Sequence, residues 1–330
     1  MRAPKRTLAL AGRTLELGDR PLLMGIVNAS PDSFSDGGLE RSLQERVELA
    51  ERLIAQGAAL IDIGGESGVT NRPAVPAREE IERVVPLIER VSARGAIVSV
   101  DTYKPAVAQA ALAAGAVLVN DVSGLRDPEL ADVCAAAGAG LVLMHTRAAP
   151  KQKLTDRSLD GRIAADVEQF LRSRIELATE RGVQFEQLML DPGPDFGKTP
   201  AQTIEALRAL ESLHTLGRPL LLAVSRKDFV GALTGRAPRG RLAGTLAAVE
   251  HGVRAGAHVL RVHDVAAASD FLAVRRALSG EEPPSPELRL ADELRWEQGP
   301  PESAPASNPV PAAADANMVP PGSRSGGRSR

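Results

Sequence analysis

The sequence predicts an α/β fold in which eight parallel strands alternate with helices and close into a (β/α)8, or TIM, barrel. Eight short apolar runs recur between residues 21 and 278. They are too continuously apolar for half-exposed strands and are typical of parallel strands buried on both faces. Amphipathic segments separate the runs. No glycine-rich dinucleotide fingerprint follows the first run, which favours a closed barrel over an open doubly wound sheet.

The strands are predicted from these runs in chain order. The runs are LLMGIVN (22–28), ALIDIG (59–64), AIVSVD (96–101), AVLVND (116–121), GLVLMH (140–145), QLMLD (187–191), LLLAVS (220–225) and HVLRVH (258–263).

Helices are predicted between the strands, where apolar residues recur at helical spacing and a glycine follows. The clearest examples cover residues 42–57, 77–95, 104–115 and 160–182. Ahead of the barrel, residues 7–19 alternate apolar and polar side chains about a turn. This pattern predicts a small hairpin that covers the bottom of the barrel.

The chain is therefore divided into three parts. Residues 1–20 form an N-terminal extension with the hairpin, and residues 21–279 form the barrel. Residues 280–330 are rich in proline, serine, glycine and charge. Such a composition offers little apolar surface to bury, so this part is predicted to be a disordered tail.

Composition excludes several functional classes. Lys and Arg number 40 against 42 Asp and Glu, so no strong field attracts nucleic acid or an anionic membrane. No apolar run approaches the roughly 20 residues of a membrane span. A single cysteine, Cys134, excludes an intrachain disulfide and a cysteine metal cluster. We expect a cytoplasmic protein without nucleic-acid or membrane partners.

Polar residues follow the end of every predicted strand. Loops at the carboxyl ends of barrel strands meet on one face, where barrel enzymes build their active sites. The sequence thus predicts a shared cleft lined by Asn28, Glu66, Asp101, Asn120, Asp121, His145, Asp191, Ser225 and His263.

Strand periodicity adds two further residues to this cleft. Arg261 shares a face with His263, and Lys227 shares one with Ser225 if the strand extends that far. An arginine inside a barrel strand needs a charged partner. We therefore expect Arg261 either to pair with a carboxylate such as Asp62 or to hold an anionic ligand.

Two of the strand-to-helix loops are unusually long. Residues 29–40 (ASPDSFSDGGLE) and 64–77 (GGESGVTNRPAVPA) are polar and rich in glycine, as lids over active sites often are. Phe34 lies in the first loop of a chain with only 2% aromatic residues. A stacking role is one interpretation of Phe34, and an apolar anchor for the loop is the other.

Over residues from about Leu22 to about Ala277, the sequence resembles dihydropteroate synthases. The motifs occur in family order: MGIVNASPDSFSDGG, IDIGGES with a following RP, SVDTYKPAVAQAALAAGA, VNDVSG, LMH, LDPG with a following FGK, SRKDFVG and RVHDV. The resemblance implies condensation of 6-hydroxymethyl-7,8-dihydropterin pyrophosphate with p-aminobenzoate, with release of pyrophosphate, in folate biosynthesis. It also implies a homodimer built on the outer helices.

The resemblance assigns roles to matching residues. Those that match the family's pterin site are Asp101, Asn120, Asp191 and Lys227. Those that match its pyrophosphate pocket are Asn28, Arg261 and His263, with Mg²⁺ on the Asn28 amide oxygen. Those that match its p-aminobenzoate pocket, which sulfonamides also occupy, are Phe34, Arg72, Pro73, Phe196, Ser225 and Lys227. The residues it implies to be catalytic are Asp101, Lys227, Arg261 and His263.

Two segments depart from the family pattern. ESGVTNRP stands where ESTRPG is usual, and DPGPDFGK, with Asp195, stands where DPGFGFGK is common. An added carboxylate facing an anionic substrate would be unfavourable. These changes resemble a divergent actinobacterial paralogue, so two alternatives stay open: a pterin-dependent transferase with another acceptor, and a non-catalytic pterin-binding protein.

Overall fold

Eight parallel strands form a barrel in the computed structural model, which describes residues 3–29, 39–67, 73–154 and 156–295. The strands follow the order β8-β7-β6-β5-β4-β3-β10-β9, and a parallel bridge between Leu190 and Leu220 joins the two ends. All eight predicted strands are present. Their bounds are β3 (Leu22–Asn28), β4 (Ala58–Gly64), β5 (Ile97–Asp101), β6 (Leu118–Asp121), β7 (Gly140–Met144), β8 (Leu188–Asp191), β9 (Leu221–Leu222) and β10 (Val259–Val262).

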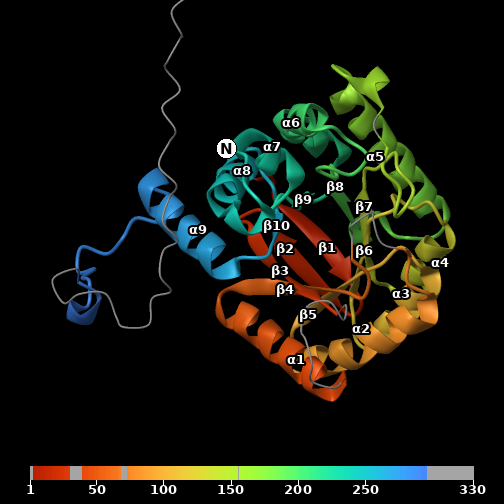
Figure 1. Ribbon diagram of the computed structural model, residues 1–330, viewed down its shortest axis with the longest axis horizontal. Coiled ribbons are helices and arrows are strands. Elements are labelled where there is room, and N and C mark those ends of the chain that lie inside the picture. The colour runs from red at the N-terminus through yellow and green to blue at the C-terminus, as the bar shows by residue number, and fades with distance from the viewer. Residues whose placement is uncertain (1–2, 30–38, 68–72, 155, 296–330) are drawn as a thin grey trace, which may run out of the picture. The chain divides into compact units, whose positions relative to one another are not determined.

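Helices surround the strands (Figure 1). They are α1 (Leu39–Ala55), α2 (Ala77–Ser92), α3 (Pro105–Ala113), α4 (Glu129–Ala137), α5 (Ile163–Glu180), α6 (Pro200–Arg208), α7 (Asp228–Thr234), α8 (Leu242–Arg254) and α9 (Val265–Ser279). The predicted alternation of strand and helix is therefore confirmed. Within the described residues, no helix combines the length and the apolar character needed to cross a bilayer.

The predicted hairpin closes the bottom of the barrel. Strands β1 (Arg6–Leu10) and β2 (Arg13–Leu17) pair antiparallel and lie across the middle of the ring in Figure 1. Leu8, Leu10 and Leu17 pack in one cluster with interior residues of the barrel strands. This apolar layer seals one end of the barrel, so the opposite end is left for polar chemistry.

A second, larger apolar cluster lies between the strands and the helices. Its side chains fill the space between the barrel strands and the surrounding helices, and Cys134 is buried among them. Contacts divide the chain into residues 1–281 and 282–330. In the second unit, the described residues include a short 3-10 turn, η6 (Asp292–Leu294). The remainder of the predicted tail, residues 296–330, lies outside the described residues.

One predicted strand is shorter than expected. Strand β9 ends at Leu222, so the strand does not extend through residues 225–227. Arg226 has a φ of 58°, in the left-handed region that an extended strand cannot contain. Ser225 and Lys227 therefore owe their directions to a turn and not to strand alternation.

Candidate functional site

Backbone strain is concentrated at the carboxyl ends of the strands. In the described part of the chain, four non-glycine residues have φ values between 54° and 67°: Leu125, Lys151, Asp195 and Arg226. They lie in the loops that follow β6, β7, β8 and β9, respectively. Such conformations persist only where surrounding contacts hold them, and they cluster at functional sites. The strain marks the face that the sequence predicted.

A buried polar cluster lies inside this end of the barrel. Arg261 in β10 donates from Nε to Asp62 Oδ2 (2.6 Å) and from Nη2 to Asp101 Oδ2 (2.7 Å). Asn120 Nδ2 also donates to Asp62 Oδ2, at 3.0 Å. We call Asp62, Asp101, Asn120 and Arg261 the deep cluster. The expected carboxylate partner of Arg261 is thus confirmed as Asp62, and Asp101 is a second one.

The charges and the hydrogen-bond acceptors of the deep cluster are not fully paired. It holds two carboxyl groups against one guanidinium, and Asp62 Oδ1 is buried without a hydrogen-bond partner among the described residues. Burial raises the pKa of Asp101 to about 7, against the opposing effect of Arg261. Unpaired buried polar atoms are costly. A ligand with N–H donors would relieve that cost.

Asp191 and Lys227 extend the cluster toward the loops after β8 and β9. Asp191 is buried, its Oδ1 accepts from the Gly193 amide at 2.7 Å, and burial raises its pKa. The Lys227 ammonium lies 4.3 Å from the centre of the Phe196 ring. Burial lowers the pKa of Lys227, whereas Asp195 and Asp191 raise it. A carboxylate, an ammonium and an aromatic face therefore border the same region.

Ser225 pairs with His263. The Ser225 hydroxyl lies 2.9 Å from His263 Nδ1, and the His263 amide donates to it at 3.2 Å. Burial, followed by the charge of Arg226, lowers the pKa of His263 to about 4, so the ring is neutral at pH 7. His145 instead meets Asp166 at 3.0 Å. Ser225 and His145 therefore do not form a hydrolase pair.

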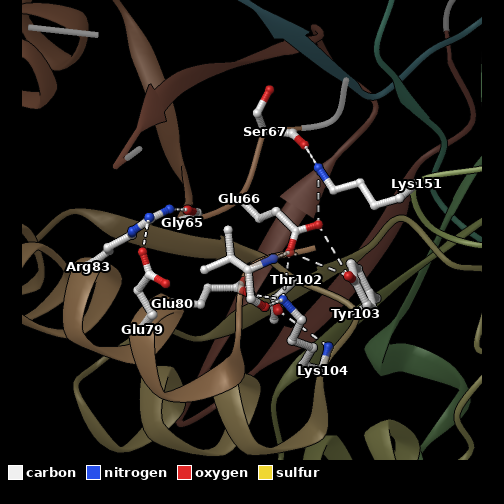
Figure 2. A network of polar contacts seen from close by, with 11 residues as sticks. Gly65, Glu66, Ser67, Glu79, Glu80, Arg83, Thr102, Tyr103, Lys104 and Lys151 are labelled. Carbon is white, nitrogen blue, oxygen red and sulfur yellow. Dashed lines mark hydrogen bonds and ion pairs between the residues drawn. The ribbon is translucent and has the colours of Figure 1, made fainter. Parts of the chain in front are cut away.

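A second group of ionic side chains fixes the base of the loop after β4 (Figure 2). Glu66 accepts hydrogen bonds from Lys104 Nζ (2.7 Å) and from the Val75 amide (2.8 Å). Lys104 also donates to Glu80 and to the Val75 carbonyl. From the loop after β7, Lys151 reaches Glu66 Oε1 at 3.2 Å and the Ser67 carbonyl. Both ends of the loop are therefore held.

We call Glu66, Glu80, Tyr103, Lys104 and Lys151 the rim cluster. Its two carboxylates face two ammonium groups. Burial alone would raise the pKa of Glu66, but hydrogen bonds from Lys104 and the Val75 amide bring it below its ordinary value. The rim cluster is thus internally paired.

Of the predicted site residues, two lie apart from the deep cluster and two lie outside the described residues. Asn28 ends β3 with an exposed side chain, and Pro73 is exposed in the loop before α2. Within the described residues, neither side chain has a hydrogen bond to the deep cluster. Phe34 and Arg72 lie outside the described residues.

The donor set for Mg²⁺ can be tested against the described residues. They contain no group of three or more His, Cys, Asp or Glu side chains that could hold a metal ion. Asn28 therefore offers a single amide oxygen. This fits Mg²⁺, which commonly keeps few protein ligands and takes phosphate oxygens and water for the rest.

Sequence reasoning missed several contributors to the site. Lys198 is buried, and its ammonium donates to the carbonyls of His145, Gly193 and Phe196 at 3.2, 2.8 and 3.2 Å. Its position after the DPG turn was the available signal. The sequence around Lys151 did not indicate its role, because its partners, Glu66 and Ser67, lie 84 or more residues earlier in the chain.

Comparison with known proteins gives consistent matches. A family model described as pterin binding enzyme matches residues 24–263. A dihydropteroate synthase of Synechocystis is 41% identical over 273 residues, which is 81% of this chain and 93% of that protein.

Two solved structures also match. The dihydropteroate synthase of Xanthomonas albilineans with 4-aminobenzoic acid aligns with a TM-score of 0.77 and 44% identity, covering 84% of this chain and 99% of that one. The same enzyme in complex with 7,8-dihydropteroate gives a TM-score of 0.72 and 45% identity, covering 82% and 98%.

Proposed function

The chain belongs to the dihydropteroate synthase family, and on that premise we propose that it condenses 6-hydroxymethyl-7,8-dihydropterin pyrophosphate with p-aminobenzoate. The products are dihydropteroate and pyrophosphate, and the protein is a transferase of folate biosynthesis. Its resemblance to enzymes solved with 4-aminobenzoic acid and with 7,8-dihydropteroate supports this choice of substrates.

The observation that carries the proposal is the unsatisfied deep cluster beside Asp191. A pterin ring presents neighbouring N–H and amino donors along one edge. Buried carboxylates at Asp191 and Asp62 accept such donors, and the Asn120 amide can both donate and accept. Lys227 supplies N–H donors to the pocket, which complement these acceptor oxygens.

The reaction needs no covalent enzyme nucleophile. The bond between the pterin methylene carbon and the pyrophosphate oxygen breaks, and the amine of p-aminobenzoate then bonds to that carbon and loses a proton. Asp101 stabilises the positive charge that develops on the pterin. Arg261 and His263 stabilise the negative charge on the departing pyrophosphate.

Arg261 serves both sides of this charge separation. Its two contacts with Asp62 and Asp101 use two of the five N–H donors of a guanidinium. His263 is neutral before substrate arrives, so it donates a hydrogen bond and does not add a charge. Asn28 is the protein ligand we assign to Mg²⁺, which neutralises charge on the pyrophosphate when bound.

The p-aminobenzoate pocket is assigned to Phe196, Lys227, Ser225 and Pro73, together with Phe34 and Arg72. Asp195 lies beside this pocket, and both of its carboxylate oxygens accept hydrogen bonds within the protein, from the Thr203 hydroxyl and from the Asp228 amide. Sulfonamides, which mimic p-aminobenzoate, are expected to compete for the pocket.

We also propose a homodimer formed by outer helices. Large apolar side chains are exposed on α7 and α9, with Leu233 at 68%, Val274 at 59% and Leu278 at 84%, and such exposed surface favours association. Sedimentation equilibrium should give twice the chain mass of 34.7 kDa. The cytoplasmic location stays a prediction.

One assay tests the function. Purified protein is mixed with the pterin pyrophosphate, Mg²⁺ and p-aminobenzoate, and both products are followed. Equal amounts of pyrophosphate and dihydropteroate are expected. Pyrophosphate without dihydropteroate would contradict the proposal and indicate another acceptor. Pterin binding without either product would indicate a non-catalytic protein.

A further inference from the structure

Asp195 occupies a backbone conformation that disfavours most side chains. Its φ is 67°, in the left-handed region where a side chain crowds the backbone and which glycine enters most readily. The residue lies in the turn after β8, directly before Phe196. A strained aspartate at this point requires contacts that offset the strain.

The first contact fixes Asp195 to α6. The Asp195 amide donates to Thr203 Oγ1 at 3.1 Å, and that hydroxyl lies 3.2 Å from Asp195 Oδ1, to which it donates. Thr203 is fully buried. The helix therefore holds both the backbone and the side chain of Asp195.

The second contact reaches the neighbouring loop. Asp195 Oδ2 accepts a hydrogen bond from the Asp228 amide at 2.5 Å. Asp228 is the first residue of α7 and follows Lys227 directly. The carboxylate thus links the turn after β8 to the segment that carries Lys227.

The link through Asp195 joins the two loops whose side chains, Phe196 and Lys227, contact each other. Phe196 follows Asp195 in the first loop, and Lys227 precedes Asp228 in the second. The Lys227 ammonium lies 4.3 Å from the Phe196 ring centre. Any change in the distance between the loops would move the ammonium relative to the ring. The Asp195 charge is also the largest favourable influence on the ammonium form of Lys227.

We propose that Asp195 is a positioning residue for the second substrate, because its carboxylate joins Thr203 to the Asp228 amide and so holds Lys227 over Phe196. The proposal rests on the proposed function only in naming p-aminobenzoate as the substrate affected. Asp195 acts through Lys227 and Phe196 and does not itself touch substrate.

Steady-state kinetics with Asp195→Gly and Asp195→Asn test the proposal. Glycine adopts a φ of 67° without strain, so the turn should survive while the link is lost. We expect Asp195→Gly to raise the KM for p-aminobenzoate about tenfold, and to change the KM for the pterin pyrophosphate less than about threefold. Asparagine tolerates the conformation and keeps an acceptor oxygen, so Asp195→Asn should stay within about threefold of the native protein.

Two kinetic results would overturn the proposal. One is an unchanged KM for p-aminobenzoate in Asp195→Gly, and the other is an equal loss in Asp195→Asn. Asp127→Gly is the matched control, because Asp127 is exposed in the loop after β6. It should leave both KM values unchanged.

Nuclear magnetic resonance gives a readout that needs no activity. In ¹³C-lysine-labelled protein, the Phe196 ring should shift the Lys227 ε-methylene signal upfield, and Lys227→Arg assigns that signal. The shift should disappear in Asp195→Gly and persist in Asp195→Asn. A shift that persists in Asp195→Gly would refute the positioning role. Should the native protein make no dihydropteroate, the proposed function fails while this measurement still decides the role of Asp195.

Discussion

The deep cluster and the rim cluster are both built from buried and half-buried polar side chains, yet they differ in how completely their charges are paired. In the rim cluster, two carboxylates face two ammonium groups and the pKa of Glu66 is lowered. In the deep cluster, two carboxyl groups share one guanidinium, Asp62 Oδ1 has no partner among the described residues, and the pKa of Asp101 is raised. We infer that the fully paired rim cluster supports a loop, whereas the incompletely paired deep cluster binds a ligand.

The largest effect should come from Lys227→Ala, which removes the ammonium that borders the deep cluster. We expect turnover to fall at least about a thousandfold, roughly 4 kcal/mol of transition-state stabilisation. The fold should survive, since Lys227 is in a loop. Single-turnover kinetics and circular dichroism measure the two outcomes, with exposed Lys153→Ala as the control. An active Lys227→Ala protein would refute the role of this residue.

Asp62→Asn should weaken binding of the pterin pyrophosphate about 10- to 100-fold. The change removes the charge that orients Arg261 and Asn120, and hydrogen bonds to charged groups contribute about 1.5–3 kcal/mol. Isothermal titration calorimetry measures the affinity. Native affinity in this variant would show that the deep cluster is structural, and the contrast between the two clusters would fail.

Lys151→Met should act more weakly, because the rim cluster reaches substrate only through the loop it supports. The variant loses the contacts with Glu66 and with the Ser67 carbonyl. We expect the KM for p-aminobenzoate to rise about 3- to 10-fold, with pterin affinity unchanged. Lys153→Met, two residues away and exposed, provides the control. A matching loss of pterin affinity would mean that the two clusters are not independent.

The last comparison concerns sign: the stability contributions of the two clusters should depend on pH in opposite directions. The folded pKa of Asp101 is raised from 3.8 to about 7, so its contribution is present at low pH and is lost as pH rises through this window. The folded pKa of Glu66 is lowered from 4.5, so its contribution is present above pH 4.5 and is lost as pH falls through the folded pKa.

Urea unfolding from pH 3 to pH 8 checks both signs. Relative to the native protein, Asp101→Asn should remove a decline in the free energy of unfolding between about pH 4 and pH 7. Glu66→Gln should destabilise at neutral pH and converge with the native protein in acid. Parallel curves for the two variants would contradict the comparison of the clusters.

Much of the fold was predictable because its signal is local. Burial on both faces produces continuous apolar runs, so all eight barrel strands were identified. The hairpin followed from simple alternation. The end of β9 was not predictable, because the turn at Arg226 depends on its contact with Asp264 (2.6 Å) and on the Thr245 hydroxyl (3.0 Å), both far along the chain.

The sequence by itself determined which face carries the chemistry, since polar residues lie at or just after the end of each predicted strand and parallel strands end on the same side. Only the tertiary structure decided how those residues pair. In the structure, Arg261 pairs with Asp62 and Asp101, Ser225 pairs with His263, and Asp195 pairs with Thr203 and the Asp228 amide. These choices depend on a few ångströms between strands and loops that are distant in sequence. The sequence fixes which polar side chains lie at the ends of the barrel strands, but the distances between them depend on how the sheet closes.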